Sequence, residues 1–134
     1  MIDIKAIVKG EPDVAPFTRI FEYSTDSEVI FFNTLDMIKE KLSKNLKINV
    51  NEALFVFSGY VVSELRDHKF KNSIESNASK VLTVDQVMIG VPETLRKITF
   101  EATVDNLPKR IITIVEPIPT GNYMLIAKPQ QGTE

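Results

Sequence analysis

The chain of 134 residues contains no cysteine and no tryptophan, and it contains one histidine. Without cysteine it can form no disulfide, cysteine-ligated zinc site or thiol nucleophile. The single His68 cannot supply a multi-histidine metal site alone. No apolar run approaches the ~18 residues of a membrane span, and residues 1–10 lack a signal-peptide pattern. We therefore expect a cytoplasmic protein with no membrane partner.

Chemistry-bearing motifs are also missing. The five glycines are isolated, so none of them forms a phosphate-binding loop. Asp67 and His68 are adjacent, which indicates a polar turn more than a catalytic dyad. We expect the carboxylates of Glu93, Glu101 and Asp105 to face water at a turn and a hairpin. The sequence therefore predicts no catalytic, cofactor-binding or metal-ligating residue in this chain, and a net charge of -2 argues against nucleic acid as the main partner.

The composition is that of an ordinary globular protein, with 43% hydrophobic and 25% charged residues. Near-alternate apolar residues over Ile2–Val8 predict a strand. The aromatic and β-branched residues of Phe17–Tyr23 predict a second strand. We therefore expect residues 1–24 to form an N-terminal strand pair, whose simplest role is to extend a sheet edge and whose sharper role is to contact a neighbouring subunit.

A first helix is predicted to begin at Thr25, because Thr25 and Glu28 have the spacing of a capping box. Apolar residues then recur at helical spacing up to about Lys44. They are Phe31, Leu35, Ile38 and Leu42. The lysines at 39, 41, 44 and 47 fit a solvated helix end better than a nucleic-acid patch, because cations complement exposed carbonyl dipoles.

The next helix should form the core. Asn49 and Glu52 have capping spacing, and Ala53–Leu65 is apolar on nearly all sides. Gly59 within it lowers helix propensity, a cost most easily offset if another backbone packs close there.

A weaker helix is predicted over residues 70–79, with Phe70 and Ile74 on one face. Its asparagines and serines have poor helix propensity, so it should depend on tertiary packing.

Another capping box at Thr83–Gln86 predicts a short helix through Met88, which Gly90 can end in a left-handed conformation. Pro92 suits the first turn of a following helix.

Two alternating segments, Ile98–Val104 and Ile111–Val115, predict a β-hairpin. Asn122–Ala127 could add a strand in a C-terminal tail, residues 119–134. The predicted fold class is α+β: a small bundle of three to four helices followed by an antiparallel β-hairpin, with an added N-terminal strand pair. The predicted units are 1–24, 25–118 and 119–134.

Several segments of this sequence resemble the urease gamma subunit family. They are Leu46–Ala53, Arg66–Asp67, Val81–Glu93, Phe100–Thr103 and Thr113–Ile118. The most specific run is Gln86–Glu93, which combines a cap, a helix stop and a proline turn in a fixed order. The sequence departs from the family at some positions: the family commonly has Pro at Asn51 and Gly at His68, and a Gly-Arg pair at Ala78–Ser79.

The resemblance implies a non-catalytic gamma subunit of a nickel-dependent urease, the enzyme that hydrolyses urea to ammonia and carbamate. It also implies urease alpha and beta subunits as partners, in a trimer of heterotrimers, with nickel held by the alpha subunit and no cofactor in this chain.

Two other interpretations stay open. The chain could be a stand-alone gamma-like scaffold without an enzyme. Three helices followed by a hairpin also match a winged-helix DNA-binding domain, with residues 70–80 as recognition helix and 105–110 as wing. Its phosphate contacts would be Lys69, Lys71, Lys80, Lys109 and Arg110. The net charge and Glu75 in the proposed recognition helix argue against that interpretation.

Overall fold

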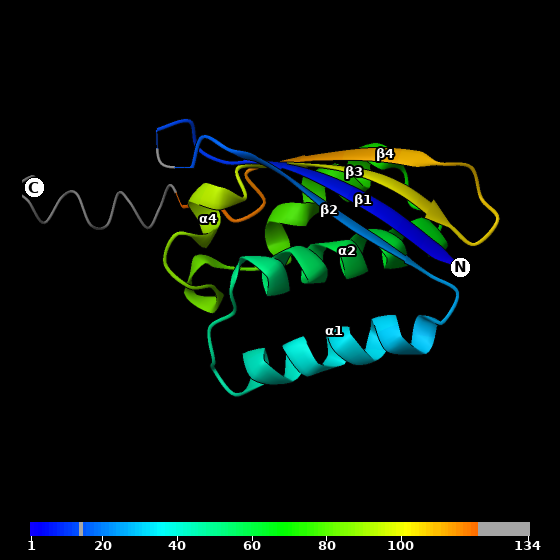
Figure 1. Cartoon of the computed structure of the whole chain (residues 1–134), viewed down its shortest axis with the longest axis horizontal. Helices are drawn as coiled ribbons and strands as arrows, with labels where there is room; N and C mark the ends of the chain where they lie inside the picture. Colours follow the sequence, from blue (N-terminus) through cyan, green and yellow to red (C-terminus); the bar gives the residue numbers. More distant parts are fainter. Residues whose placement is uncertain (14, 121–134) are drawn as a thin grey trace, which may run out of the picture.

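A four-stranded antiparallel sheet organises the molecule, and the two long helices, α1 (Glu28–Ser43) and α2 (Val50–Arg66), lie on one face of it (Figure 1). The computed structural model describes residues 1–13 and 15–120. The strands are β1 (Ile2–Lys9), β2 (Thr18–Thr25), β3 (Lys97–Val104) and β4 (Arg110–Val115), arranged in the order β2-β1-β3-β4. Both predicted N-terminal strands and the predicted hairpin are confirmed, and with them the α+β fold class. The possible strand Asn122–Ala127 lies outside the described residues.

The N-terminal strands extend the hairpin sheet, as expected. β1 pairs with β2 along one edge and with β3 along the other, so it occupies an interior position. Its even-numbered side chains are all buried: Ile2, Ile4, Ala6 and Val8. They belong to the same hydrophobic cluster as the hairpin and the helices. The N-terminal strands are therefore part of the main core and not an appendage to it.

The helices follow β2 and precede the hairpin. They are α1 (Glu28–Ser43), α2 (Val50–Arg66), α3 (Lys71–Asn77) and the single turn α4 (Val91–Thr94), with 3₁₀ turns at Ala78–Lys80 and Val84–Gln86. The predicted stripe of α1 is confirmed, since Phe31, Leu35 and Ile38 are buried.

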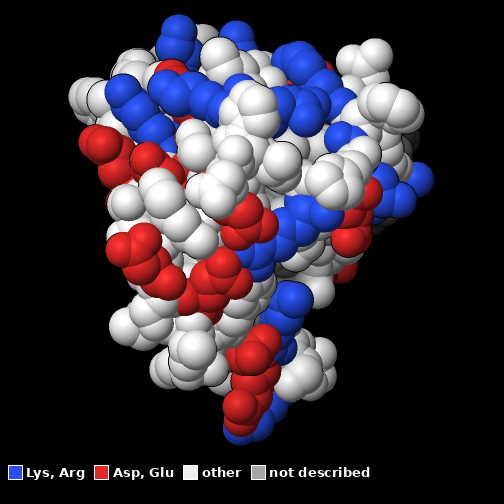
Figure 2. Space-filling view, turned by 90° about the vertical axis from the view of Figure 1, so that its right-hand side faces the viewer, with Lys and Arg blue, Asp and Glu red and all other residues white. Residues whose placement is uncertain are grey.

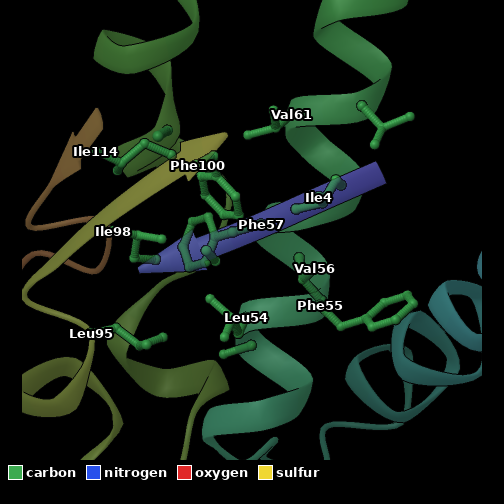
Figure 3. Packing of buried hydrophobic residues seen from close by; sticks show 14 of the residues in the cluster. Ile4, Leu54, Phe55, Val56, Phe57, Val61, Leu95, Ile98, Phe100 and Ile114 are labelled. Carbon is green, nitrogen blue, oxygen red and sulfur yellow. The ribbon is translucent and has the colours of Figure 1, made fainter. Parts of the chain in front are cut away.

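Helix α2 is the central helix, as predicted. Its capping box is confirmed: the Glu52 N–H donates to Asn49 Oδ1 at 2.9 Å, and the Asn49 N–H donates to Glu52 Oε1 at 3.0 Å. Phe57 and Val61 point toward the strands, whereas Phe55 points toward α1 (Figure 3). Because α2 is covered on nearly every side by the rest of the chain, its apolar side chains are buried without a membrane or a helix of another protein.

The capping box predicted at Thr25 is wrong. Thr25 is still in β2, paired with Ile2, and its Oγ1 accepts a hydrogen bond from the Ser27 N–H at 2.9 Å. The helix begins at Glu28 without a side-chain cap, because the Glu28 carboxylate pairs with Arg66 instead of reaching back to the backbone.

Two packing predictions are also wrong. Phe70 is 83% exposed whereas Ile74 is buried, because Phe70 has an extended backbone as the N-cap of α3 and so falls outside the helical periodicity. The close neighbour of Gly59 is a side chain and not a backbone: a Cβ at Gly59 would lie 2.6 Å from Leu35 Cδ2.

The capping interaction at Thr83 is present, with the Thr83 N–H donating to Gln86 Oε1 at 2.9 Å. The helix it opens is only one 3₁₀ turn, shorter than predicted, because the Met88 N–H bonds to the Ile48 carbonyl at 2.9 Å. Gly90 is left-handed with φ 94°, but it precedes α4 instead of ending a helix.

Candidate assembly surface

Arg66, at the end of α2, joins three separated parts of the chain. Its Nη2 donates to Glu28 at the start of α1 and, at 2.9 Å, to Asp105 in the β3–β4 turn. These hydrogen bonds lower the pKa of both carboxyls and raise the pKa of the guanidinium. Asp105 thus serves a charge cluster that connects the helices with the hairpin.

The other residues considered for chemistry do not converge. Asp67 caps the end of α2, and the adjacent His68 is exposed. Glu101 lies 3.7 Å from Lys109 on the hairpin, whereas Glu93 is in α4. Within residues 1–13 and 15–120, no three His, Cys, Asp or Glu side chains are grouped so that they could hold a metal ion.

The lysines near the end of α1 have local partners. Lys41 Nζ lies 2.6 Å from Glu52 Oε2, and Lys47 Nζ donates to the Asp85 carbonyl at 2.7 Å. The pKa of Glu52 is lowered: burial raises it, but the hydrogen bonds from Lys41 and the Asn49 N–H outweigh that effect. These lysines connect neighbouring elements, which agrees with a helix-end role.

The geometry does not favour the winged-helix interpretation. Basic side chains gather along the β4 side of the molecule, with acidic and basic groups mixed below (Figure 2). Helix α3 lies against β4, where Lys71 is bonded to Glu75 and to the Ile111 carbonyl. Lys71, one of the proposed phosphate contacts, is therefore engaged in hydrogen bonds within the chain.

Side chains of α3 close the outer edge of β4. The Lys71 Nζ donates to the Ile111 carbonyl at 3.1 Å, and Glu75 Oε2 accepts from the Thr113 N–H at 2.8 Å. Burial raises the pKa of Glu75, but the hydrogen bonds from Lys71 and the Thr113 N–H outweigh that effect, so the pKa is lowered overall. This ion pair satisfies strand-edge groups that could otherwise pair with another chain.

Apolar side chains remain exposed at several places on the described part of the chain. One is a cavity of about 280 Å³ beside α4, where Met88 is 45% exposed and Ile89 fully exposed. Among the described residues, the buried Glu93 Oε1 in its wall has no hydrogen-bond partner. Another is the outer face of β2, where Ile20 is exposed. Contiguous exposed apolar groups, such as Met88 and Ile89 at the cavity, are typical of protein contact surfaces.

These features define a small α+β protein whose described residues offer contact surfaces and no assembled metal cluster. Residues 23–118 match the family model described as "Urease, gamma subunit". The chain belongs to the urease gamma subunit family.

Two curated relatives are similar to the chain. The urease subunit gamma of Halalkalibacterium halodurans is 34% identical over 91 residues, which cover 68% of this chain and 90% of that protein. The urease subunit gamma of Saccharopolyspora erythraea is 30% identical over 82 residues, covering 61% and 81% respectively. The family match begins inside β2, so all of β1 precedes it.

Sequence reasoning missed the two charge clusters. The spacing of Lys71 and Glu75 suggests a pair on one helix face, but not that both would reach β4. Arg66 had no sequence signal pointing to Glu28 and Asp105, since these partners lie 38 and 39 residues away.

Proposed function

We propose that this chain is a non-catalytic gamma subunit of a nickel-dependent urease, which hydrolyses urea to ammonia and carbamate. The observation that carries the proposal is the family match over residues 23–118, which spans the helices and the hairpin. Most of β2 and all of β1 add to that shared body.

The nickel chemistry is proposed to belong to the partner alpha subunit. The described residues of this chain do not fit a nickel site, because their acidic side chains are dispersed and several bind cations. Imidazole, the ligand expected for nickel, is present once in the sequence, at an exposed turn.

The proposed assembly is a trimer of heterotrimers with alpha and beta subunits, located in the cytoplasm. Support for a contact role comes from the exposed apolar groups of the cavity near α4 and of the β2 side. None of the helices among residues 1–13 and 15–120 is long and apolar enough to cross a membrane.

Co-expression tests this proposal. The full chain is produced with the urease alpha and beta subunits of its own genome, with nickel supplied, and purified through a tag on the alpha subunit. We expect the chain to co-purify in a complex that hydrolyses urea, and omission of the chain to reduce the yield of that complex. A chain that stays alone with all candidate subunits present contradicts the proposal and favours a stand-alone scaffold.

A further inference from the structure

The outer edge of β2 carries backbone groups that no described residue satisfies. The Asp105 N–H donates to the Met1 carbonyl at 2.8 Å, so these residues form a hydrogen-bonded antiparallel pair. Bonded and non-bonded pairs alternate along such a ladder. In the continuous register of the sheet, the even-numbered residues of β1 therefore bond the odd-numbered residues of β2. The N–H and C=O groups of Ile20 and Glu22 point outward.

The opposite edge confirms this assignment. The same alternation makes Ile111 and Thr113 the outward-pointing residues of β4. These are the residues that Lys71 and Glu75 bond. In the described part of the chain, no corresponding bond reaches Ile20 or Glu22.

The helix-facing side of this open edge is only partly covered. Phe21 and Tyr23 lie on that side, because they pair with the buried Ala6 and Ile4 of β1. Both are only partly buried, although Tyr23 packs on Phe31 of α1 and Phe55 of α2. A strand added outside β2 would therefore cover Phe21 and Tyr23 with its own helix-facing side chains.

Charge on the outer sheet face indicates what such a strand would contain. Lys5 is opposite Glu101 on one side and Glu22 on the other, so the sign alternates across the sheet. Glu22 is the outermost member of this row and is exposed. A basic residue opposite Glu22 would continue the alternation, because opposite charges are favoured in cross-strand pairs.

A second copy of β2 does not supply this basic residue. When two antiparallel strands pair, residues directly opposite each other lie on the same face of the sheet. The outer-face residues of β2 are Thr18, Ile20, Glu22 and Ser24, and none of them is basic.

We propose that the edge of β2 binds an extended segment of another urease subunit as a fifth strand, which also covers Phe21 and Tyr23 on the helix-facing side. The segment presents its backbone to Ile20 and Glu22, a basic residue opposite Glu22, and apolar side chains at the alternate, helix-facing positions. This inference rests on the proposed function, because it takes the partner to be a urease subunit.

The test uses Ile20→Pro in the full chain. Proline removes the outward N–H of residue 20 and is tolerated at an edge strand because that N–H bonds nothing within the sheet. The control Ile20→Val keeps the N–H and the branched side chain. Affinity for the co-purified alpha and beta subunits is measured by biolayer interferometry, after thermal unfolding shows that each variant is folded. We expect about tenfold weaker binding for Ile20→Pro and an unchanged affinity for Ile20→Val.

Amide hydrogen exchange of the wild-type chain gives a second readout that does not depend on the variant's folding. The amides of Ile20 and Glu22 should exchange rapidly in the isolated chain and slowly in the complex. Equal affinity of Ile20→Pro and wild type overturns the inference, as does fast exchange of both amides in the complex. Slow exchange in the isolated chain also overturns it, because the edge would then be covered by the chain itself. If wild type binds none of the subunits, the proposed function fails first.

Discussion

The two outer strands of the sheet differ in how their outward backbone groups are hydrogen-bonded. On β4, Lys71 and Glu75 of α3 bond the outward backbone groups of Ile111 and Thr113. On β2, the described residues leave the equivalent groups without a bond and leave Ile20 60% exposed. The closed edge lies within the family match, whereas β2 enters that match only at its end.

The two edges therefore differ in role: the β4 edge contributes to the stability of the chain, whereas the β2 edge is open to contact with another chain. An unpaired strand edge invites other chains, and proteins usually block it with charge or cover. The β4 edge has both, in a short helix of poor propensity that is held by the strand it protects. The β2 edge carries the charged Arg19 and Glu22, but no described side chain bonds its outward backbone groups, whereas its neighbour β1 is wholly integrated in the core. The N-terminal strands are thus structurally necessary and still open on one side.

The largest effect on stability should come from a substitution in β1, the interior strand that pairs with both β2 and β3. Ile4→Ala in β1 removes a fully buried side chain and should lower the free energy of unfolding by about 3 kcal/mol. The exposed Ile20→Ala in the neighbouring β2 should change it by less than about 0.5 kcal/mol. Urea unfolding followed by circular dichroism measures both. Similar small losses would show that the N-terminal strands do not share the core.

Opening the closed edge should have the next largest effect. Glu75→Ala leaves the Thr113 N–H without its carboxylate acceptor and should cost roughly 1–2 kcal/mol. The Thr113 amide should then exchange faster in a hydrogen-exchange measurement. Glu22→Ala on the open edge is the matched control: it should change the free energy of unfolding by less than about 0.5 kcal/mol and leave the exchange of the Thr113 amide unchanged. An unchanged Thr113 amide would contradict the closing role of Glu75.

The turn before α3 offers a stabilising change. His68 has φ 57°, a left-handed conformation that costs energy for a side chain with a Cβ. His68→Gly should therefore raise the free energy of unfolding by about 0.5–1 kcal/mol, after the extra entropy of glycine in the unfolded chain. Gly90→Ala, at φ 94°, should act in the opposite direction. A loss of stability in His68→Gly would mean that the imidazole makes a contact worth more than the strain.

The smallest effect is the dependence of stability on acidic pH. The pKa of Glu75 is lowered in the folded chain from its ordinary value of 4.5, so its stabilisation is present above that value and is lost as pH falls through the lower folded pKa. The stability difference between wild type and Glu75→Gln should shrink between about pH 5 and pH 3. Thermal unfolding across this range measures it. A constant difference would show that Glu75 does not titrate with folding.

Local features could be predicted from the sequence because their causes lie within a few residues. The alternation of Ile98–Val104 gives a strand with one buried face. Asn49 and Glu52 form a capping box because both partners are on the same turn. The resemblance of Gln86–Glu93 to the urease gamma family was also visible in the sequence, and the family match includes it.

Errors arose where a distant residue competed with a local pattern. Thr25 and Glu28 have capping spacing, but Arg66 takes the Glu28 carboxylate. Phe70 and Ile74 have helical spacing, but the helix begins after Phe70. For the candidate surface, the sequence offered only the hypothesis that an N-terminal strand pair contacts another subunit. Its open edge depends on the sheet order, which no local pattern contains.

The sequence by itself determined the element types, the apolar faces and the family, because side-chain periodicity and capping act over one or two turns. Only the tertiary structure decided that β1 lies inside the sheet, that α3 closes β4 and that β2 is left open. Those outcomes depend on which strands pair and which helix covers which edge. Pairings across the whole chain, such as that of Ile2 with Val104, bring these parts together.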